Sequence, residues 1–229
     1  MNILILGGSH FVGFHIASAI LAAGHSVSLF NRGRSNAKTL PGAEQLIGDR
    51  DGDLTALENR CWDIAIDVSG YLPRLVNDSV TVLRGQVKQY IFISTASVYD
   101  EQKVTPNIKE NGPLETLTDN STETIDDNTY GGLKVLCEQA VIKGFKNKSL
   151  VLRLGLMAGP HEKFPERLYW IRRVSLGGGI LVPTVYDRYF NFIDVRDVAD
   201  FILTAINESL SGIYNVGGSA QMTLQCWLA

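Results

Sequence analysis

The sequence is poor in cysteine. Cys61, Cys137 and Cys226 are widely spaced among 229 residues, and none lies in a CxxC or Cys/His pair. This pattern favours neither a disulfide framework nor a zinc site. We therefore expect no metal centre, and a reducing, cytoplasmic setting.

Long apolar runs and an excess of positive charge are also missing. No segment approaches the roughly 18 apolar residues of a membrane span, and residues 1–8 carry no basic leader. Lys plus Arg number 21 against 24 Asp plus Glu, which gives a net charge of −3. A chain with this balance has no broad electrostatic reason to bind nucleic acid or an anionic membrane. We expect neither as a partner.

Short apolar runs alternate with helical patterns along the first two thirds of the chain. Such alternation is typical of an α/β fold with a doubly wound parallel sheet, whose strands are apolar throughout because both faces are buried. The expected strands are 2–6, 26–30, 44–47, 63–68, 90–94 and 150–154. The expected helices are 13–23, 73–85 and 130–143, the last ending at Gly144.

A glycine-rich turn follows the first expected strand and leads directly into a helix. Strand, turn and helix in this order are the context that a dinucleotide fingerprint requires. His10 stands where the middle glycine would let the backbone approach a pyrophosphate, and offers a donor instead. A tight turn without a ligand is the alternative. The candidate cofactor residues here are Gly7, Gly8, Ser9, His10, Phe11, Val12 and Gly13.

The turn after the second strand carries basic residues where an acid would hold the ribose of NAD. Asn31 is followed by Arg32 and Arg34, and guanidinium groups suit the 2′-phosphate of NADP. We therefore expect NADP rather than NAD, with a solvated basic turn as the alternative. After the third strand, Asp49 and Arg50 are added to the cofactor residues, because an acid there can accept a hydrogen bond from an adenine amino group.

Hydroxyl groups and a lysine complete the candidate site. Ser94 and Thr95 end a buried strand, and Tyr130 and Lys134 lie four residues apart, on one face of a helix. An ammonium beside a phenol is expected to lower the phenol's pKa, which makes it usable as an acid or base near neutrality. Taken alone, a Tyr and Lys pair at this spacing most often lies on the protein surface and has no catalytic role.

Together these motifs resemble the short-chain dehydrogenase/reductase superfamily. More narrowly, the segments 93–99, 152–160, 191–199 and 212–218 are similar to signatures of its extended or atypical NAD(P)-dependent epimerase/dehydratase branch. The resemblance implies a Rossmann fold, with Thr95 and Tyr130 as catalytic hydroxyls and Lys134 holding the nicotinamide ribose. Ser94 is the second choice of hydroxyl. The resemblance adds Ser69, Gly70 and Tyr71 to the cofactor residues.

The resemblance predicts an NAD(P)-dependent oxidoreductase or epimerase that acts on a small hydroxyl- or carbonyl-bearing substrate such as a sugar nucleotide. Sugar-nucleotide dehydratases carry an Asp-Glu pair where this chain has Ala96 and Ser97, so elimination chemistry is not expected. The alternative is a non-catalytic, NADP-binding regulatory or RNA-associated family member. A homodimer through the helices beside strands four and five is also implied.

The domain organisation follows from the same pattern. Residues 1–155 are predicted to form the cofactor domain, to which 191–216 returns, while 156–190 and 217–229 form a small substrate portion that stops short, as in a truncated or minimal member. The polar stretch 100–129 is expected to be a lid or insertion, with disorder as the alternative. Further substrate candidates are His161, Trp170, Arg172, Arg173, Tyr186 and Tyr189. A solvated helix face explains the two arginines better, and a role in core packing is commoner for the three aromatic residues.

Overall fold

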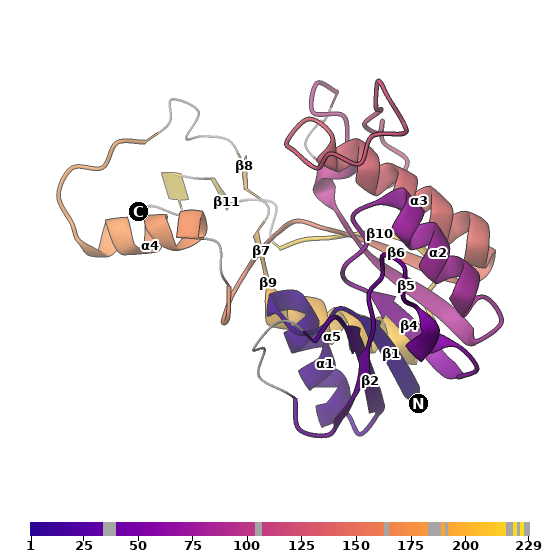
Figure 1. The fold of residues 1–229 in the computed structure, drawn as a ribbon. Helices are drawn as coiled ribbons and strands as arrows, with labels where there is room; N and C mark the ends of the chain where they lie inside the picture. The colour runs from indigo at the N-terminus through magenta and orange to yellow at the C-terminus, as the bar shows by residue number, and fades with distance from the viewer. Residues whose placement is uncertain are drawn as a thin grey trace.

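A parallel sheet of seven strands forms the centre of the computed structural model, which describes residues 1–33, 40–103, 107–162, 165–182, 189–190, 192–218, 222–223 and 225–226 (Figure 1). The strand order is β10-β6-β5-β4-β1-β2-β3. The strands are β1 (Asn2–Leu6), β2 (Ser26–Asn31), β3 (Ala43–Ile47), β4 (Trp62–Asp67), β5 (Val87–Thr95), β6 (Ser149–Leu154) and β10 (Gly212–Val216). All six predicted strands are present, and the predicted doubly wound α/β class is confirmed.

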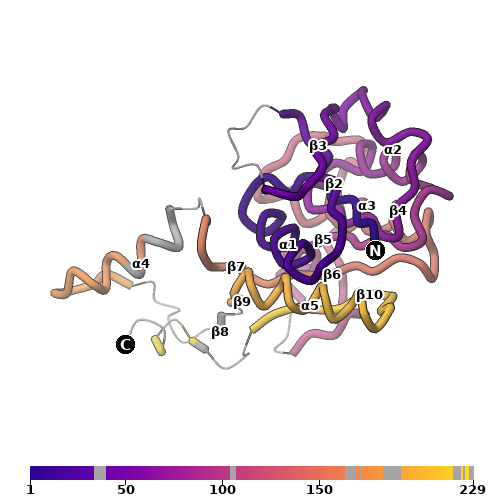
Figure 2. Tube along the Cα trace, turned by 90° about the horizontal axis from the view of Figure 1, so that it is seen from below, coloured from indigo at the N-terminus to yellow at the C-terminus, as the bar shows by residue number. Residues whose placement is uncertain are grey.

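Two pairs of helices cover the two faces of this sheet. Helices α1 (Phe11–Ala22) and α5 (Val195–Asn207) pack side by side on one face, and α2 (Pro73–Leu83) and α3 (Tyr130–Phe145) on the other (Figures 1 and 2). Strand β1 shows why the central strands are mostly apolar. Ile3 and Ile5 join the core beneath α1 and α5, whereas Leu4 and Leu6 join the core beneath α2 and α3. Each side chain is at most 1% exposed, and burying one contributes about 1.5–3 kcal/mol.

Helix α3 corrects one sequence prediction. It was expected to end at Gly144, but it continues to Phe145, and the left-handed residue after it is Lys146, with φ 52°. Gly144 is needed for packing instead. A Cβ atom there would lie 2.2 Å from Cγ1 of Val80 on α2. The glycine therefore lets the two helices approach closely rather than capping one of them.

Smaller elements complete the chain. They are the 3₁₀ turns η1 (Thr55–Leu57), η2 (Ala96–Val98) and η3 (Lys146–Lys148), the strand pairs β7 (Leu156–Ala158) with β9 (Phe192–Asp194) and β8 (Tyr189–Phe190) with β11 (Met222–Thr223), and α4 (Pro165–Ser175). Figure 2 shows α4 away from the central sheet. Among the described residues, no helix is long and apolar enough to cross a membrane.

The polar excursion is tied to the body of the protein over its described part, residues 100–103 and 107–129. Leu114 forms a β-bridge with Tyr99, and Glu123 pairs with Arg74 of α2 at 2.7 Å. Arg74 also pairs with Asp51 at 2.8 Å, so one guanidinium joins the excursion, α2 and the turn after β3. The excursion is thus a structured insertion over these residues, and its role as a lid stays a prediction.

Candidate active site

The candidate residues come together at the edge of the sheet where the parallel strands end. Gly7 follows β1, Ser69 follows β4 and Thr95 is the last residue of β5. In doubly wound sheets this carboxyl edge, where the strand order reverses, is where ligands bind. The reversal here lies between β1 and β4, next to the glycine turn.

The glycine turn has the geometry of an anion cradle. Gly7 and Gly8 adopt φ values of 102° and 88°, which favour glycine, and a Cβ on Gly13 would lie 2.5 Å from the Cα of Gly8. Helix α1 therefore begins directly against the turn. The first N–H groups of a helix have no intrahelical acceptor, and the N-cap residue His10 supplies none from its side chain. These amides fit a pyrophosphate, and Ser9, Phe11 and Val12 complete this segment.

Some side chains after β2 and β3 are hydrogen-bonded within the chain, and others are exposed and could contact a ligand. The side chain of Asn31 receives a hydrogen bond from the Gly33 N–H at 2.9 Å and donates one to Gln45 at 3.2 Å. Arg32 is exposed, and Arg34 lies outside the described residues. Asp49 accepts a hydrogen bond from the Asp51 N–H at 3.1 Å. Of the two arginines expected to select NADP, only Arg32 is therefore seen, and it is open to solvent.

Arg50 is committed to a buried ion pair rather than open to a ligand. Its guanidinium donates to the two oxygens of Asp67 at 2.6 and 2.5 Å, and these side chains are 11% and 0% exposed. Asp67 also accepts from the Tyr90 hydroxyl at 2.8 Å and from the Ser69 N–H at 3.1 Å. Burial by itself would raise the pKa of Asp67, but the charge and hydrogen bonds of Arg50 lower it overall. Arg50 therefore stabilises the end of β4 through Asp67, and its side chain is not free to contact a ligand.

Thr95 and Tyr130 are brought together as predicted. Tyr130 is the first residue of α3, and its phenol lies near Thr95, which acts to lower the pKa of the phenol. The Thr95 hydroxyl also accepts from the Ser97 N–H and donates to the Ser97 hydroxyl, both at 3.2 Å. Gly131 makes this approach possible, because a Cβ there would lie 2.2 Å from the carbonyl oxygen of Ser97.

The pKa of Tyr130 is raised, which corrects the expectation that Lys134 lowers it. Burial is the main cause of the raised pKa, neighbouring Tyr71 adds to it, and Thr95 opposes it. The ammonium of Lys134 is occupied elsewhere: it donates to the carbonyl oxygens of Gly70 and Ile93, at 2.8 Å each. Burial lowers the pKa of Lys134 itself to about 8.

Tyr71 forms the exposed wall beside this pair. Its side chain is 47% exposed, and its ring lies 6.4 Å from the ring of Tyr130 and 5.5 Å from the Lys134 ammonium, measured to ring centroids. An exposed aromatic ring at the carboxyl edge offers a flat surface for a ligand.

The family model that describes NAD dependent epimerases/dehydratases matches residues 75–217, more than half of the chain and including Thr95, Tyr130 and Lys134. The chain belongs to this family. A curated relative, the chloroplast stem-loop binding protein of 41 kDa b from Arabidopsis thaliana, is 28% identical over 97% of this chain. The chain spans 60% of the length of that relative.

Solved epimerases share the fold of this family member. UDP-glucuronic acid 4-epimerase from Bacillus cereus, in complex with NAD, superposes with a TM-score of 0.78 at 17% identity, covering 98% of this chain and 80% of the other. UDP-N-acetylglucosamine 4-epimerase from the same organism gives 0.75 at 19% identity, covering 97% and 80%. These likenesses show the Rossmann-type fold of the chain.

A buried network that sequence reasoning missed lies next to Thr95 and Tyr130 in this epimerase/dehydratase family member. Ser94, the second choice of hydroxyl, donates to Glu138 at 2.6 Å and so faces away from the site. Glu138 forms an ion pair with Arg153 at 2.7 Å, with side chains 3% and 1% exposed. Arg153 also donates to the Tyr99 hydroxyl at 2.9 Å and the Glu110 carbonyl at 2.8 Å.

One signal in the sequence points to this network. Arg153 is a single charge inside an apolar strand, and a buried charge requires a partner. Glu138 lies four residues after Lys134, which places it on the same face of α3.

The later substrate candidates are only partly described. His161 has φ 67°, and its ring lies 5.0 Å from that of Phe14 and 5.7 Å from that of His15, so it packs on α1 near the glycine turn. Arg173 donates to the carbonyl of Gly177 at 2.8 Å, whereas Arg172 is exposed. The ring of Trp170 packs against Tyr169 at 5.2 Å. Tyr186 lies outside the described residues, and only the backbone of Tyr189 is described.

Proposed function

We propose that this chain is an NADP-dependent oxidoreductase or epimerase in which Tyr130 transfers a proton at a hydroxyl or carbonyl of the substrate. The observation that carries the proposal is that Thr95 and Tyr130 lie together at the carboxyl edge, beside the glycine turn, where Thr95 acts on the pKa of the phenol. When bound, the nicotinamide supplies or accepts a hydride. The turn and the first amides of α1 would hold its pyrophosphate.

The site favours proton donation by Tyr130. Because its pKa is raised, the phenol keeps its proton at neutral pH and can donate it to an oxygen that gains negative charge. Thr95 lies near the phenol, and the Thr95 hydroxyl is itself held by Ser97. Buried Lys134 holds Gly70 and Ile93 in place, so the backbone beneath the phenol is fixed. Reduction of a carbonyl is the direction that this arrangement supports best.

Sugar nucleotides are the substrate class that we propose. Several proteins of this fold are named as UDP-sugar epimerases, and in an epimerase the oxidised carbon is reduced again in the same cycle. Ala96 and Ser97 follow Thr95, and neither has a carboxylate, so the Asp-Glu pair that elimination uses is missing at these two positions. We therefore propose epimerisation or carbonyl reduction rather than dehydration.

The cofactor preference is tested by fluorescence titration with NADPH and NADH. NADPH should bind several-fold more tightly, and the R32A/R34A variant should lose this preference, because each guanidinium can contact the 2′-phosphate. The control variant K109A alters an exposed cation on the excursion and should keep the preference. Equal affinities in the unmodified chain would refute the NADP assignment.

The acid/base role is tested with the variant Y130F on a panel of UDP-hexoses and UDP-uronic acids. Loss of the phenol proton should abolish turnover while cofactor affinity changes less than about twofold, because general acid catalysis typically contributes a factor of 10²–10⁴. The control variant S94A removes the hydroxyl that faces Glu138 and should keep turnover if it folds. Turnover that persists in Y130F would remove Tyr130 from its role.

RNA association is a second candidate, and the name of the Arabidopsis relative favours it. The net charge of −3 offers little attraction to a phosphate backbone. A filter-binding assay with a stem-loop RNA at physiological salt separates the two candidates. Retention with a steep salt dependence would favour RNA association, and lack of retention would dismiss it.

A further inference from the structure

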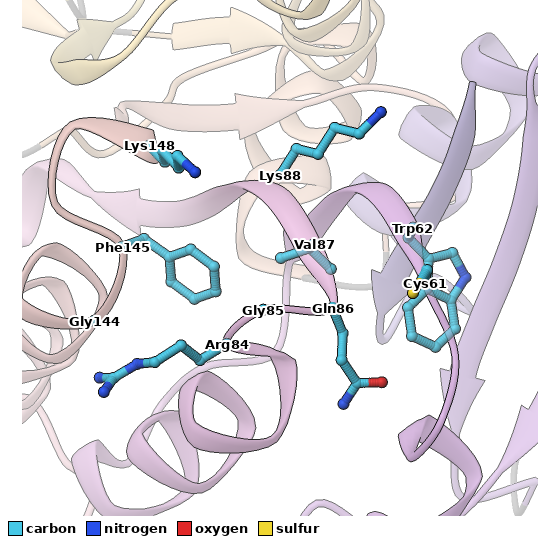
Figure 3. Close-up of a pocket in the computed structure, with 10 residues that line it drawn as sticks. All are labelled: Cys61, Trp62, Arg84, Gly85, Gln86, Val87, Lys88, Gly144, Phe145 and Lys148. Atoms are coloured by element: carbon cyan, nitrogen blue, oxygen red, sulfur yellow. The ribbon is translucent and has the colours of Figure 1, made fainter.

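A hollow lies at the amino ends of the strands, at the edge opposite to the candidate active site. It has a volume of about 390 Å³ and sits where β4 and β5 begin and where α2 and α3 end (Figure 3). Strand β5 spans the distance between the two edges. Its nine residues, at about 3.3 Å each, place the hollow roughly 26 Å from Thr95. A ligand in this hollow is therefore separate from the proposed chemistry.

The wall of the hollow carries positive charge and no acid. Arg84, Lys88 and Lys148 line it, and none of its ten lining residues is acidic. Lys88 pairs with Asp63 at 2.7 Å, outside the hollow. The side chains of Arg84 and Lys148 have no hydrogen-bond or ion-pair partner among the residues that the structure describes; the backbone N–H of Arg84 donates to the Val80 carbonyl. Figure 3 shows their side chains on either side of the Phe145 ring.

The partial negative charges at the carboxyl ends of α2 and α3 do not balance the positive charges of Arg84 and Lys148. The carboxyl end of a helix carries about half a negative charge, so α2 and α3 together bring about one. Lys143 and Lys146 already lie at the end of α3. Arg84 and Lys148 therefore leave a surplus of about one positive charge in the hollow, even before these two lysines are counted.

We infer that this hollow binds a small phosphate ester, with the phosphate between Arg84 and Lys148 and the organic part against Val87 and Phe145. The two cations supply charge-assisted hydrogen bonds to a dianion. The two apolar side chains form the floor of the hollow and suit a flat or aliphatic group. The volume is that of a small-molecule site. A flat, extended basic surface, which a nucleic acid backbone needs, is not what these residues form.

The test is calorimetric titration of the full chain with phenyl phosphate, which joins one phosphate to one flat apolar ring. Saturable binding is expected, and the R84A/K148A variant should weaken it at least about tenfold, because two charge-assisted contacts are lost. Both side chains are exposed, so this variant should fold, and its circular dichroism should match that of the unmodified chain.

Two controls locate the binding. K143A/K146A removes two nearby cations that do not line the hollow, and R32A alters the proposed cofactor site; both should leave the affinity within about twofold. Absence of saturable binding up to about 10 mM would overturn the inference. So would an equal loss in K143A/K146A, which indicates general charge attraction, or a loss confined to R32A, which indicates the cofactor site.

One further arm addresses RNA. Retention of a stem-loop RNA that depends on Arg84 and Lys148, without binding of phenyl phosphate, would replace the inference with a nucleic acid surface. None of these outcomes depends on turnover, so the hollow and the proposed function stand or fall separately.

Discussion

Replacement of Arg50 by methionine tests the buried support of the candidate site. In the native chain two hydrogen bonds of 2.6 and 2.5 Å join its guanidinium to Asp67, whose side chain is fully buried. Methionine keeps much of the apolar stem but removes the charge. Asp67 is then left with the Tyr90 hydroxyl and the Ser69 N–H as hydrogen-bond donors.

The expected cost is large because a buried carboxylate loses its counter-charge. Breaking a buried pair by removing one partner costs about 3–5 kcal/mol, and the two donors that remain place R50M near the lower end, at about 3 kcal/mol. The matched control is R60M, which breaks the Arg60–Glu44 pair. These side chains are 43% and 49% exposed, so R60M should cost less than about 1 kcal/mol. Urea denaturation followed by circular dichroism measures both variants.

The pH dependence of the stability loss in R50M shows whether the unpaired Asp67 carboxylate causes that loss. In the native chain its pKa is lowered, so its contribution to stability is present above the unfolded value of about 3.9 and is lost only as pH falls through the folded value. In R50M, burial dominates and raises the pKa above 3.9, so the carboxyl takes up a proton as pH falls. The stability gap between R50M and the native chain should therefore narrow between about pH 7 and pH 5. A gap below about 1 kcal/mol at pH 7, or one that is unchanged at pH 5, would refute this reasoning.

Three further predictions concern single positions. G131A should destabilise the chain more than G132A, as measured by urea denaturation, because its Cβ meets the Ser97 carbonyl, whereas a Cβ on Gly132 meets a leucine side chain that can move; equal effects would contradict this. K134M should remove a rise in stability between about pH 8 and pH 10, since the buried lysine, with a pKa of about 8, is deprotonated in the folded chain before it is in the unfolded chain; parallel pH profiles would refute it. D194A should cost about 1 kcal/mol because Asp194 caps α5 by accepting the N–H of Arg196, and D194N, which keeps a good cap, should cost less; the same urea assay decides.

The sheet was predictable because burial on both faces leaves a direct trace in the sequence. The four buried residues of β1, Ile3 to Leu6, are all apolar because helices cover both sides of the sheet, so the strand can be recognised from the composition of this run. The end of α3 was not predictable in the same way. Gly144 matches a helix stop signal, but its reason is Val80 on another helix, and local patterns do not contain that contact.

The candidate site was predictable as a set of positions but not as a set of contacts. Ser94 and Thr95 are neighbours at the end of a strand, and only the placement of α3 decides that Thr95 meets Tyr130 while Ser94 meets Glu138. The four-residue spacing on a helix also predicted that Lys134 lies beside the phenol of Tyr130. It did not reveal that two backbone carbonyls hold the ammonium of Lys134, and therefore it gave the wrong direction for the pKa of Tyr130.

The contacts of Asn215 bear on the order in which the chain matures during synthesis. Its N–H donates to the Glu110 carboxylate at 2.9 Å and its side-chain amide to the Ile108 carbonyl at 3.0 Å, across 105 and 107 residues of sequence. A ribosome adds about 5–20 residues per second, so the stretch around Glu110 is made about 5–20 s before these partners exist. The insertion beside the candidate site therefore reaches its final contacts only after β10, the last strand of the seven-stranded sheet, has been synthesised, so the insertion and the sheet are completed at the same stage of synthesis.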